Sequence, residues 1–515
     1  MKKIYRNIIA VVFAVAAIGC SDEDLLDKNP YNSIPETAAF DSPENIALTV
    51  NGMYEAAAIG TYAGGGGRGY VWGAAYVEQN DCRGEDVVNT ASFYAITYQA
   101  TYNANTANNM YYWHDGYNLI NKANIVIEGV TQAIADGVIS EEEGKNIIGQ
   151  ARFLRGITHF ELNVQMARPY HHTPDASHLG IILRDFAIKN DESLENAELE
   201  GSRATVAQVY EHVLADLDYA EQNTQNGSLI YASSNAAIAF KTRVYQHMGK
   251  WDKVIEEANK IENTYTLTDE PSGVFDNNHG NTESIFSINQ TSQANAGVNG
   301  ALGSQYGRRL LVAISPIIWN NPGWLADDKR RAYGSDTDLV REVDGSLYTN
   351  KYRDHSTYSD LAPIIRHAEV KLNLAEALAR HTNDLQGAID RLNEVRDRAL
   401  ADPATQSYTL NGMNALPTKK DIVEAIILER RIEFLMEGKR YGDIHRLQGD
   451  DLAPISGIPG KVANGVPDPS LYQAASGNMP PLGEAAIPYD DYRFIWPIPM
   501  SETSVNADAE QNPGY

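Results

Sequence analysis

Cysteine is almost absent from this chain of 515 residues, which contains only Cys20 and Cys82. Two cysteines allow at most one disulfide, so a chain of this length must be held together by an apolar core. Apolar residues make up 43% of the sequence, which is enough to build such a core. If Cys20 serves another purpose, Cys82 has no partner and is expected to be a partly buried small residue.

Long hydrophobic runs and basic residues are also scarce. After residue 20 the sequence contains no run of 18 apolar residues, so no membrane-spanning helix is expected in the body of the protein. The chain has 42 basic and 68 acidic residues, and its formal net charge is −26. A chain this acidic repels a phosphate backbone, so nucleic acid is not an expected partner.

The first residues have the composition of an export signal. Residues 1–6 include three basic residues and no acidic one, and an apolar run follows over residues 8–18. A helix of about eleven residues spans roughly 17 Å, which is too short for a bilayer core of about 30 Å. This pattern predicts a cleaved signal peptide over residues 1–19.

Cys20 directly follows this signal and resembles the lipidated cysteine of bacterial lipoproteins, with Ala17 where leucine is usual. Cleavage would make Cys20 the N-terminus, and a diacylglycerol on its thiol would anchor the protein to a membrane. Residues 20–40 would then be the lipidated start and a tether. The acidic residues 22–24 resemble the surface-export signal of Bacteroidetes lipoproteins, which implies the extracellular face of the outer membrane. The alternative is a secreted protein with a chance cysteine.

Helical periodicity dominates the rest of the chain. Apolar residues at three- and four-residue spacing predict helices over 43–58, 105–134, 141–167, 205–223, 234–249, 251–262, 363–381, 384–400 and 419–437. The long stretches 60–104, 264–360 and 449–515 lack this period and are rich in glycine, asparagine, tyrosine or proline. Such long loops are uncommon unless they carry function. The sequence therefore predicts a mostly α-helical scaffold with long irregular insertions and few short strands.

Two helix pairs share a pattern of turn, large and small residues. The matching positions are Gly249, Trp251, Val254 and Ala258 in one pair, and Asn383, Leu385, Ala388 and Leu392 in the other. This spacing resembles tetratricopeptide repeats, in which stacked helix pairs share one core. Generic helical hairpins are the alternative.

Three segments together resemble the SusD/RagB family of outer-membrane nutrient-binding lipoproteins. The segments are R-H-A-E-V-K-L-N-L-A-E-A at 366–377 with N-E-V-R-D-R-A at 393–399, I-L-E-R-R-I-E-F at 427–434 with E-G-K-R-Y-G-D-I at 437–444, and the ending I-W-P-I-P with Q-N-P-G-Y. With the lipoprotein start, the resemblance covers nearly the whole chain. It implies one SusD-like domain over 41–515, with an N-terminal part to about residue 230 and a C-terminal part from 231.

The resemblance also implies a function. Family members bind oligosaccharides, or sometimes peptides, at the cell surface and act with a SusC-like TonB-dependent outer-membrane transporter. About four tetratricopeptide-like helix pairs are expected to face this transporter, and the irregular insertions to face the ligand. The expected protein is not an enzyme and has no cofactor.

The charged residues of the 427–444 segment could suggest catalysis. However, Arg430 is three residues from Glu433, and Glu437 is three residues from Arg440; interleaved opposite charges at this spacing, with Glu429 beside them, are typical of ion pairs. We therefore expect a structural network. A glycoside hydrolase, which needs two carboxylates across a cleft, is the alternative from another class. The histidines at 171, 172 and 178 lack a metal-binding spacing, so no metal site is expected.

Sugar binding calls for a flat aromatic side chain and polar groups that pair with hydroxyls. Three tryptophans lie in the irregular stretches, and several tyrosines and polar residues lie near the first of them. The candidate ligand-binding residues are Trp72, Asn80, Asp81, Arg83 and Tyr94 from the first stretch, and Trp319, Asn320 and Trp324 from the second. The alternative is that these side chains pack the loops onto the scaffold.

Overall fold

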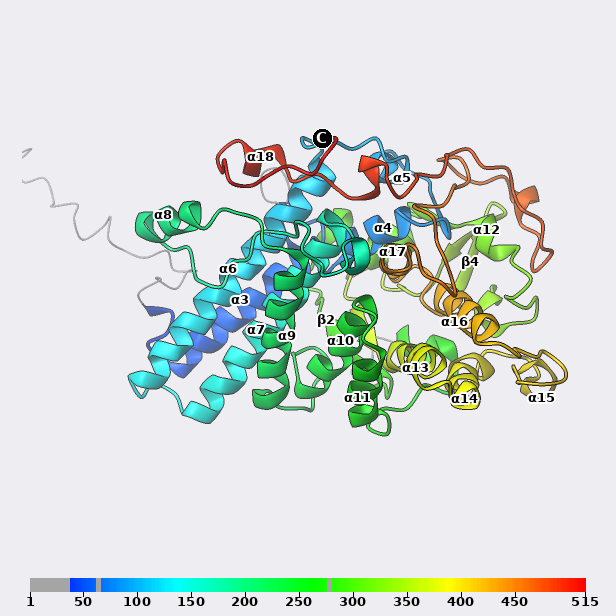
Figure 1. Ribbon diagram of the computed structural model, residues 1–515, viewed down its shortest axis with the longest axis horizontal. Coiled ribbons are helices and arrows are strands. Elements are labelled where there is room, and N and C mark those ends of the chain that lie inside the picture. Colours follow the sequence, from blue (N-terminus) through cyan, green and yellow to red (C-terminus); the bar gives the residue numbers. More distant parts are fainter. Residues whose placement is uncertain (1–37, 62–65, 276–279) are drawn as a thin grey trace, which may run out of the picture.

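The long helices form a row along one side of the molecule in the computed structural model, which describes residues 38–61, 66–275 and 280–515 (Figure 1). They are α3 (Pro43–Ile59), α6 (Ala107–Ala135), α7 (Glu141–Met166), α9 (Val206–Asn223), α10 (Ser234–His247), α11 (Trp251–Ile261), α13 (His367–Ala377), α14 (Leu385–Asp397) and α16 (Lys419–Glu433). These bounds confirm the predicted helices to within a few residues. Strand β6 (Ala362–Arg366) takes the first residues of the helix predicted over 363–381.

Local sequence determines where several helices begin. The Ser42 side chain accepts a hydrogen bond from the backbone N–H of Asn45 at 3.2 Å, and Pro43 occupies the first turn of α3. Thr205 and Gln208 form a reciprocal capping box at the start of α9. These caps satisfy N–H groups that have no partner within the helix.

Helices that follow one another in sequence pack side by side. Contacts join α6 to α7, α10 to α11 and α13 to α14, and further contacts of α7 with α9, α11 with α13, and α13 with α16 continue the row. This stacking is consistent with the predicted tetratricopeptide-like scaffold. One apolar core extends from Ile46 on α3 to Ala509 near the C-terminus, and a second one joins α13, α14 and α16. The division of residues 41–515 near residue 230 stays a prediction.

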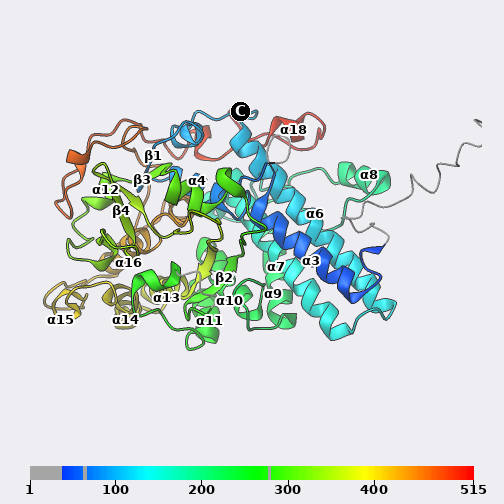
Figure 2. The same cartoon turned by 180° about the vertical axis from the view of Figure 1, so that it is seen from behind.

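The irregular segments gather on the other side of the molecule and contain short antiparallel strand pairs (Figure 2). The pairs are β1 (Val87–Asn89) with β3 (Val312–Ile314), β2 (Ser284–Ile288) with β6, and β4 (Val340–Val343) with β5 (Ser346–Thr349). Asp344 and Gly345 have φ values of 51° and 79° and close the β4–β5 hairpin, as a two-residue turn of this kind requires. The β1–β3 pair joins the first irregular stretch to the second.

The stretch 60–104 is less irregular than its sequence indicates. It contains α4 (Ala74–Cys82) and the short α5 (Ala95–Tyr98). All nine residues of α4 are buried, so the helix has no exposed polar face and no apolar period that would identify it in the sequence. The prediction of a non-helical segment was therefore wrong at α4.

Cys82 ends α4 and is a free, fully buried thiol. Cys20 and the predicted signal and tether up to residue 37 lie outside the described residues. Among the helices of the described ranges, none combines the length and the apolar character that a membrane crossing needs.

Candidate ligand-binding site

The charged residues of the 427–444 segment form a buried network. Arg366 donates to Glu433 at 2.7 Å and to Glu437 at 3.0 Å. Arg330 donates to Glu433 at 2.8 Å and to Glu429 at 2.5 Å. These groups are all at most 4% exposed, and they join α16 to β6 and to the segment before β4. The predicted structural role is confirmed, and the ion pairs link different elements.

The network keeps its carboxylates ionised. Burial alone would raise the pKa of Glu433, but Arg398, Arg366 and Arg330 outweigh burial and hold it well below its usual range. Arg366 and Lys351 lower the pKa of Glu437 against burial in the same way. Since each buried charge is paired and hydrogen-bonded, the network fixes geometry and offers no carboxylate to a substrate.

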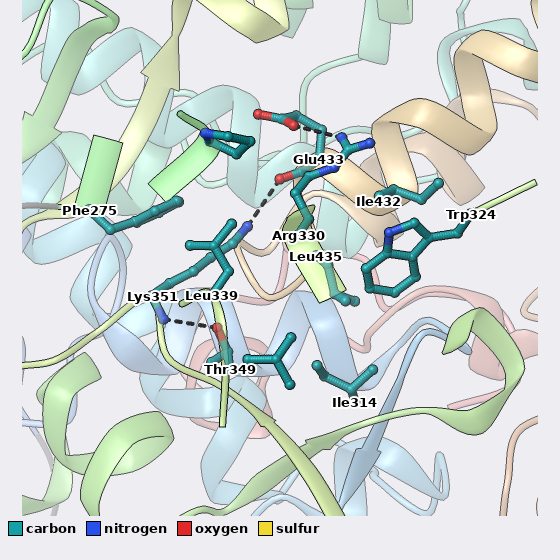
Figure 3. Close-up of a pocket in the computed structure, with 12 residues that line it drawn as sticks. Phe275, Ile314, Trp324, Arg330, Leu339, Thr349, Lys351, Ile432, Glu433 and Leu435 are labelled. Carbon is teal, nitrogen blue, oxygen red and sulfur yellow. Dashed lines mark hydrogen bonds and ion pairs between the residues drawn. The ribbon is translucent and has the colours of Figure 1, made fainter. Parts of the chain in front are cut away.

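A small cavity of about 20 Å³ lies beside this network (Figure 3). Phe275, Trp324 and Ile432 line it, together with Lys351, which donates to the Glu433 backbone carbonyl at 3.0 Å. A space of this size holds about one water molecule. The cavity is too small for a sugar ring.

All eight ligand-binding candidates from the sequence lie in the interior. Trp319 is the most exposed of them, at 5%. The eight are Trp72, Asn80, Asp81, Arg83, Tyr94, Trp319, Asn320 and Trp324. Their side chains present almost no surface to solvent in this structure, and their part in ligand binding stays a prediction.

The candidates of the first stretch bind other parts of the protein. Trp72 donates its indole N–H to Thr158 on α7 at 3.1 Å. Arg83 lies over the ring of Tyr441, 3.5 Å from its centroid, and donates to its hydroxyl. Asn80, Asp81 and Tyr94 are also enclosed; Asn80 accepts from Gln165 at 2.7 Å. These contacts fasten the first irregular stretch onto the helices.

The candidates of the second stretch support a loop. The guanidinium of Arg331 lies 4.6 Å from the ring centroid of Trp319 and 4.1 Å from that of Trp324. Asn320 donates to the backbone carbonyls of Leu471 and Asn478, and so holds a loop of the C-terminal stretch. The Arg331 contacts fix the start of the loop over residues 333–339, which leads to β4.

An open pocket of about 400 Å³ lies where this loop meets the β4–β5 hairpin. Its lining residues are Tyr333, Gly334, Ser335, Asp336, Val340, Arg341, Glu342, Asn350 and His355. The Tyr333 side chain is 49% exposed, and most of the other lining residues are polar. The pocket combines a flat aromatic side chain with hydrogen-bonding groups, as binding of a sugar ring requires.

The pocket wall is held by hydrogen bonds between side chains and the backbone. The Asn350 side-chain amide donates to the carbonyls of Asp336 and Asp338, at 3.1 and 2.8 Å. The Asp338 carboxylate in turn accepts from the backbone N–H of Ser335 at 2.8 Å. These bonds fix the loop between Tyr333 and β4, so the pocket is formed before any ligand enters it.

His355 forms part of the pocket next to Gly307. A side chain on Gly307 would place Cβ 2.5 Å from the imidazole Nε2, so only glycine fits there. Burial, followed by the nearby charges of Arg341 and Arg308, lowers the pKa of His355. His355 is therefore uncharged at neutral pH.

A second opening, of about 230 Å³, lies between α6, α8 (Asp191–Leu199) and α18 (Met500–Thr503). Its polar residues are already bonded inside the protein; for example, the Asn124 amide donates to the Phe186 carbonyl at 2.8 Å. Within the described ranges, no three histidine, cysteine or acidic side chains are placed to hold a metal ion.

Tyr333, Arg341 and His355 were missed by reasoning from sequence alone. Tyr333 lies in the predicted ligand-bearing stretch 264–360, but tryptophan was taken as the marker of the site there. The Asp344-Gly345 pair is a hairpin signal that would have placed β4 and Arg341. Nothing local in the sequence brings His355 to the same pocket.

Two family models match different parts of the chain. The family model for the SusD family matches residues 331–515, and the model described as "Starch-binding associating with outer membrane" matches residues 24–246. These two matches, in different parts of the chain, confirm the SusD/RagB resemblance that the sequence motifs indicate.

Individual relatives agree with this assignment. SusD-like protein P2 of Formosa agariphila is 27% identical, covering 89% of this chain and 93% of the relative. A SusD superfamily protein of Bacteroides fragilis has a similar structure, with a TM-score of 0.73, 27% identity, and coverage of 92% of this chain and 99% of the other. Another, from Bacteroides thetaiotaomicron, gives a TM-score of 0.70 at 22% identity, covering 92% and 100%.

Proposed function

We propose that this protein is a cell-surface lipoprotein that captures oligosaccharides and delivers them to a SusC-like TonB-dependent outer-membrane transporter. The single observation that carries the proposal is the pocket of about 400 Å³ at Tyr333. A half-exposed tyrosine offers a stacking face to a sugar ring, while Asp336, Glu342 and Arg341 supply groups that pair with hydroxyls. A family model described as starch-binding supports the same ligand class.

The position at the membrane rests on sequence. The export signal and Cys20 favour a lipid anchor, and the acidic residues 22–24 favour the outer face of the outer membrane. A lipid anchor would hold the pocket where large glycans first meet the cell. A Cys20→Ala variant should then fail to incorporate palmitate and should leave the membrane fraction. Retention of the unlabelled variant in the outer membrane would contradict the anchor.

Binding is tested on a soluble form of the protein that begins at Ser21 and so lacks the signal peptide and Cys20. Calorimetry against a panel of neutral and acidic oligosaccharides should give binding to at least one, and the Tyr333→Ala variant should bind it more weakly. The same incubations are analysed for shortened products. Turnover would favour the glycoside hydrolase alternative, and binding of peptides without any glycan would favour the peptide-binding alternative.

Delivery to a transporter is tested in cells. Co-purification of the lipidated protein with a TonB-dependent outer-membrane protein, and loss of oligosaccharide uptake when the gene is deleted, are the expected results. Uptake that stays unchanged without the protein would contradict a role in delivery.

A further inference from the structure

Two exposed arginines lie at the edge of the Tyr333 pocket, and both bind neutral oxygens. Arg341 on β4 donates to the Gly307 backbone carbonyl at 3.2 Å. Arg308, which follows Gly307 in the chain, donates to the Tyr358 hydroxyl at 2.6 Å. Gly307, whose carbonyl binds Arg341, lies beside His355 of the pocket and directly precedes Arg308, so Arg308 belongs to the segment that borders the pocket.

This chain has 68 acidic residues for 42 basic ones, yet some arginines bind neutral oxygens; Arg184 and Arg203, for example, donate to backbone carbonyls from buried positions. Other arginines in the described ranges, such as Arg366 and Arg398, pair with carboxylates even when buried. Exposed pairs also form, as between Lys189 and Glu128. Across the residues that the structure describes, no carboxylate forms an ion pair with Arg308 or Arg341.

The backbone brings these two arginines together. Residues Gly303–Arg308 form a wide π-helical turn, which presents the Gly307 carbonyl to Arg341. Because Gly307 has no side chain, His355 and the Tyr352 carbonyl approach its backbone closely. Turns of this kind are rare in helices and are frequent at functional sites.

We propose that the pocket selects an acidic oligosaccharide, with a carboxylate or sulfate group of the sugar held by Arg308 and Arg341 while a neighbouring ring lies on Tyr333. This inference rests on the proposed glycan-binding function. Each guanidinium has five N–H donors and commits few of them, so both keep donors that match the oxygens of an oxyanion.

The pocket also contains acidic residues, and they restrict where an anion fits. Asp336 and Glu342 line it together with Arg341. Asp354 adds a further negative charge near His355, but its carboxylate already accepts from the backbone N–H groups of Thr357 and Ser359, both at 2.8 Å. The ligand's charged group therefore belongs on the side of Arg308 and Arg341.

Calorimetry with defined probes tests the inference. Trigalacturonate carries the carboxylate and a κ-carrageenan tetrasaccharide carries the sulfate; α-1,4-linked galactotriose and the desulfated carrageenan tetrasaccharide are the neutral counterparts. The acidic probe of at least one pair should bind more tightly than its neutral counterpart, and the preference should fall as sodium chloride rises. Arg341→Gln and Arg308→Gln should each weaken acidic binding by about tenfold to a hundredfold, a larger loss than either variant causes for the neutral counterpart.

Two control variants separate local contacts from net charge. Lys145→Gln removes one positive charge on α7, where Lys145 is exposed and pairs with Glu141, and should change no affinity. Arg341→Lys keeps the charge and should recover part of the acidic preference. If the protein binds neutral and acidic probes with equal affinity, and the arginine variants have the same affinities as wild type, the inference is wrong but the glycan-binding function stands. If no glycan of any kind binds, the proposed function fails with it.

Discussion

The backbone N–H of Gly438 donates to the Asp81 carboxylate at 3.0 Å, although the two residues are 357 positions apart in the sequence. Asp81 also accepts from the Tyr306 hydroxyl at 2.6 Å. One carboxylate thus joins α4, the π-helical turn next to the pocket and the turn after α16. Glu437 and Gly438 begin the sequence motif over residues 437–444, and each has a physical role. Glu437 is part of the buried network of ion pairs, and Gly438 packs on α4.

Gly438→Ala should destabilise the protein. Gly438 has φ of +70°, and a Cβ there would lie 2.9 Å from the Val77 Cα. Strain and displacement of α4 should lower the free energy of unfolding by about 1–3 kcal/mol, measured by urea denaturation. Gly442→Ala is the matched control, because its Cβ would meet no atom closer than 3.7 Å. Equal stability of the two variants would show that α4 is not tightly packed on this turn.

Glu433→Gln should be more damaging. Glu433 accepts from Arg366 at 2.7 Å and from Arg398 at 2.5 Å in a buried site, so its neutralisation leaves buried positive charge without compensation. A loss of about 3–5 kcal/mol in the free energy of unfolding is expected. Glu141→Gln removes an exposed ion pair with Lys145 and should have little effect. A small effect of Glu433→Gln would mean that water enters the network.

Glu78→Gln should stabilise the protein in a pH-dependent way. Burial raises the pKa of Glu78 on α4 from 4.5 to about 8. Between these values the unfolded chain ionises Glu78 while the folded protein keeps it protonated, so its contribution to stability is complete below pH 4.5 and is lost as pH rises to about 8. Glutamine does not titrate.

The gain from Glu78→Gln should therefore be small at pH 4.5 and largest at pH 8. Urea denaturation of wild type and variant at pH 4.5, 6 and 8 measures it. Glu342→Gln, at an exposed position, serves as the control and should give a difference that does not vary in this way. A flat difference for Glu78→Gln would place the folded-state pKa near its ordinary value.

Helices such as α9, α11 and α14 were predictable because each buries one face. The three- and four-residue spacing in α9 shows that face directly, and its cap Thr205 marks where the helix starts. The same approach failed at α4, where Glu78, Asn80 and Asp81 are buried as fully as the apolar residues. Polar residues whose partners come from distant segments carry no local signal.

The candidate site was predictable only as a region. The prediction took a tryptophan in an irregular stretch as a sign of ligand contact. A large apolar side chain in a loop can equally pack the loop onto the scaffold, because it buries the most surface area. Trp319 and Trp324 lie against Arg331 under the loop, and the smaller Tyr333 two residues later is exposed. Whether an aromatic side chain faces solvent depends on the folded loop, which the composition of the stretch does not reveal.

Trp72→Ala and Trp319→Ala should therefore act mainly on stability. Both side chains are buried, and Trp72 loses its hydrogen bond to Thr158 as well as its packing. Each variant should lose about 3–5 kcal/mol of unfolding free energy. Calorimetry on the folded fraction decides between the two roles. Normal stability with lost glycan binding would favour the direct ligand contact expected from the sequence.

Tyr333→Ala should have the opposite profile, with normal stability and weaker binding. Its ring is 49% exposed in the pocket, so truncation removes a stacking face and leaves no buried cavity. Affinity for the bound oligosaccharide should fall about tenfold to a hundredfold, whereas Tyr333→Phe should retain most of it, because the ring face is kept. Tyr231→Ala removes a tyrosine of similar exposure, 41%, outside the pocket and should leave affinity unchanged. If Tyr333→Ala binds as tightly as Tyr231→Ala, the ligand lies elsewhere on the irregular face, and the pocket between the loop and the β4–β5 hairpin is not the site.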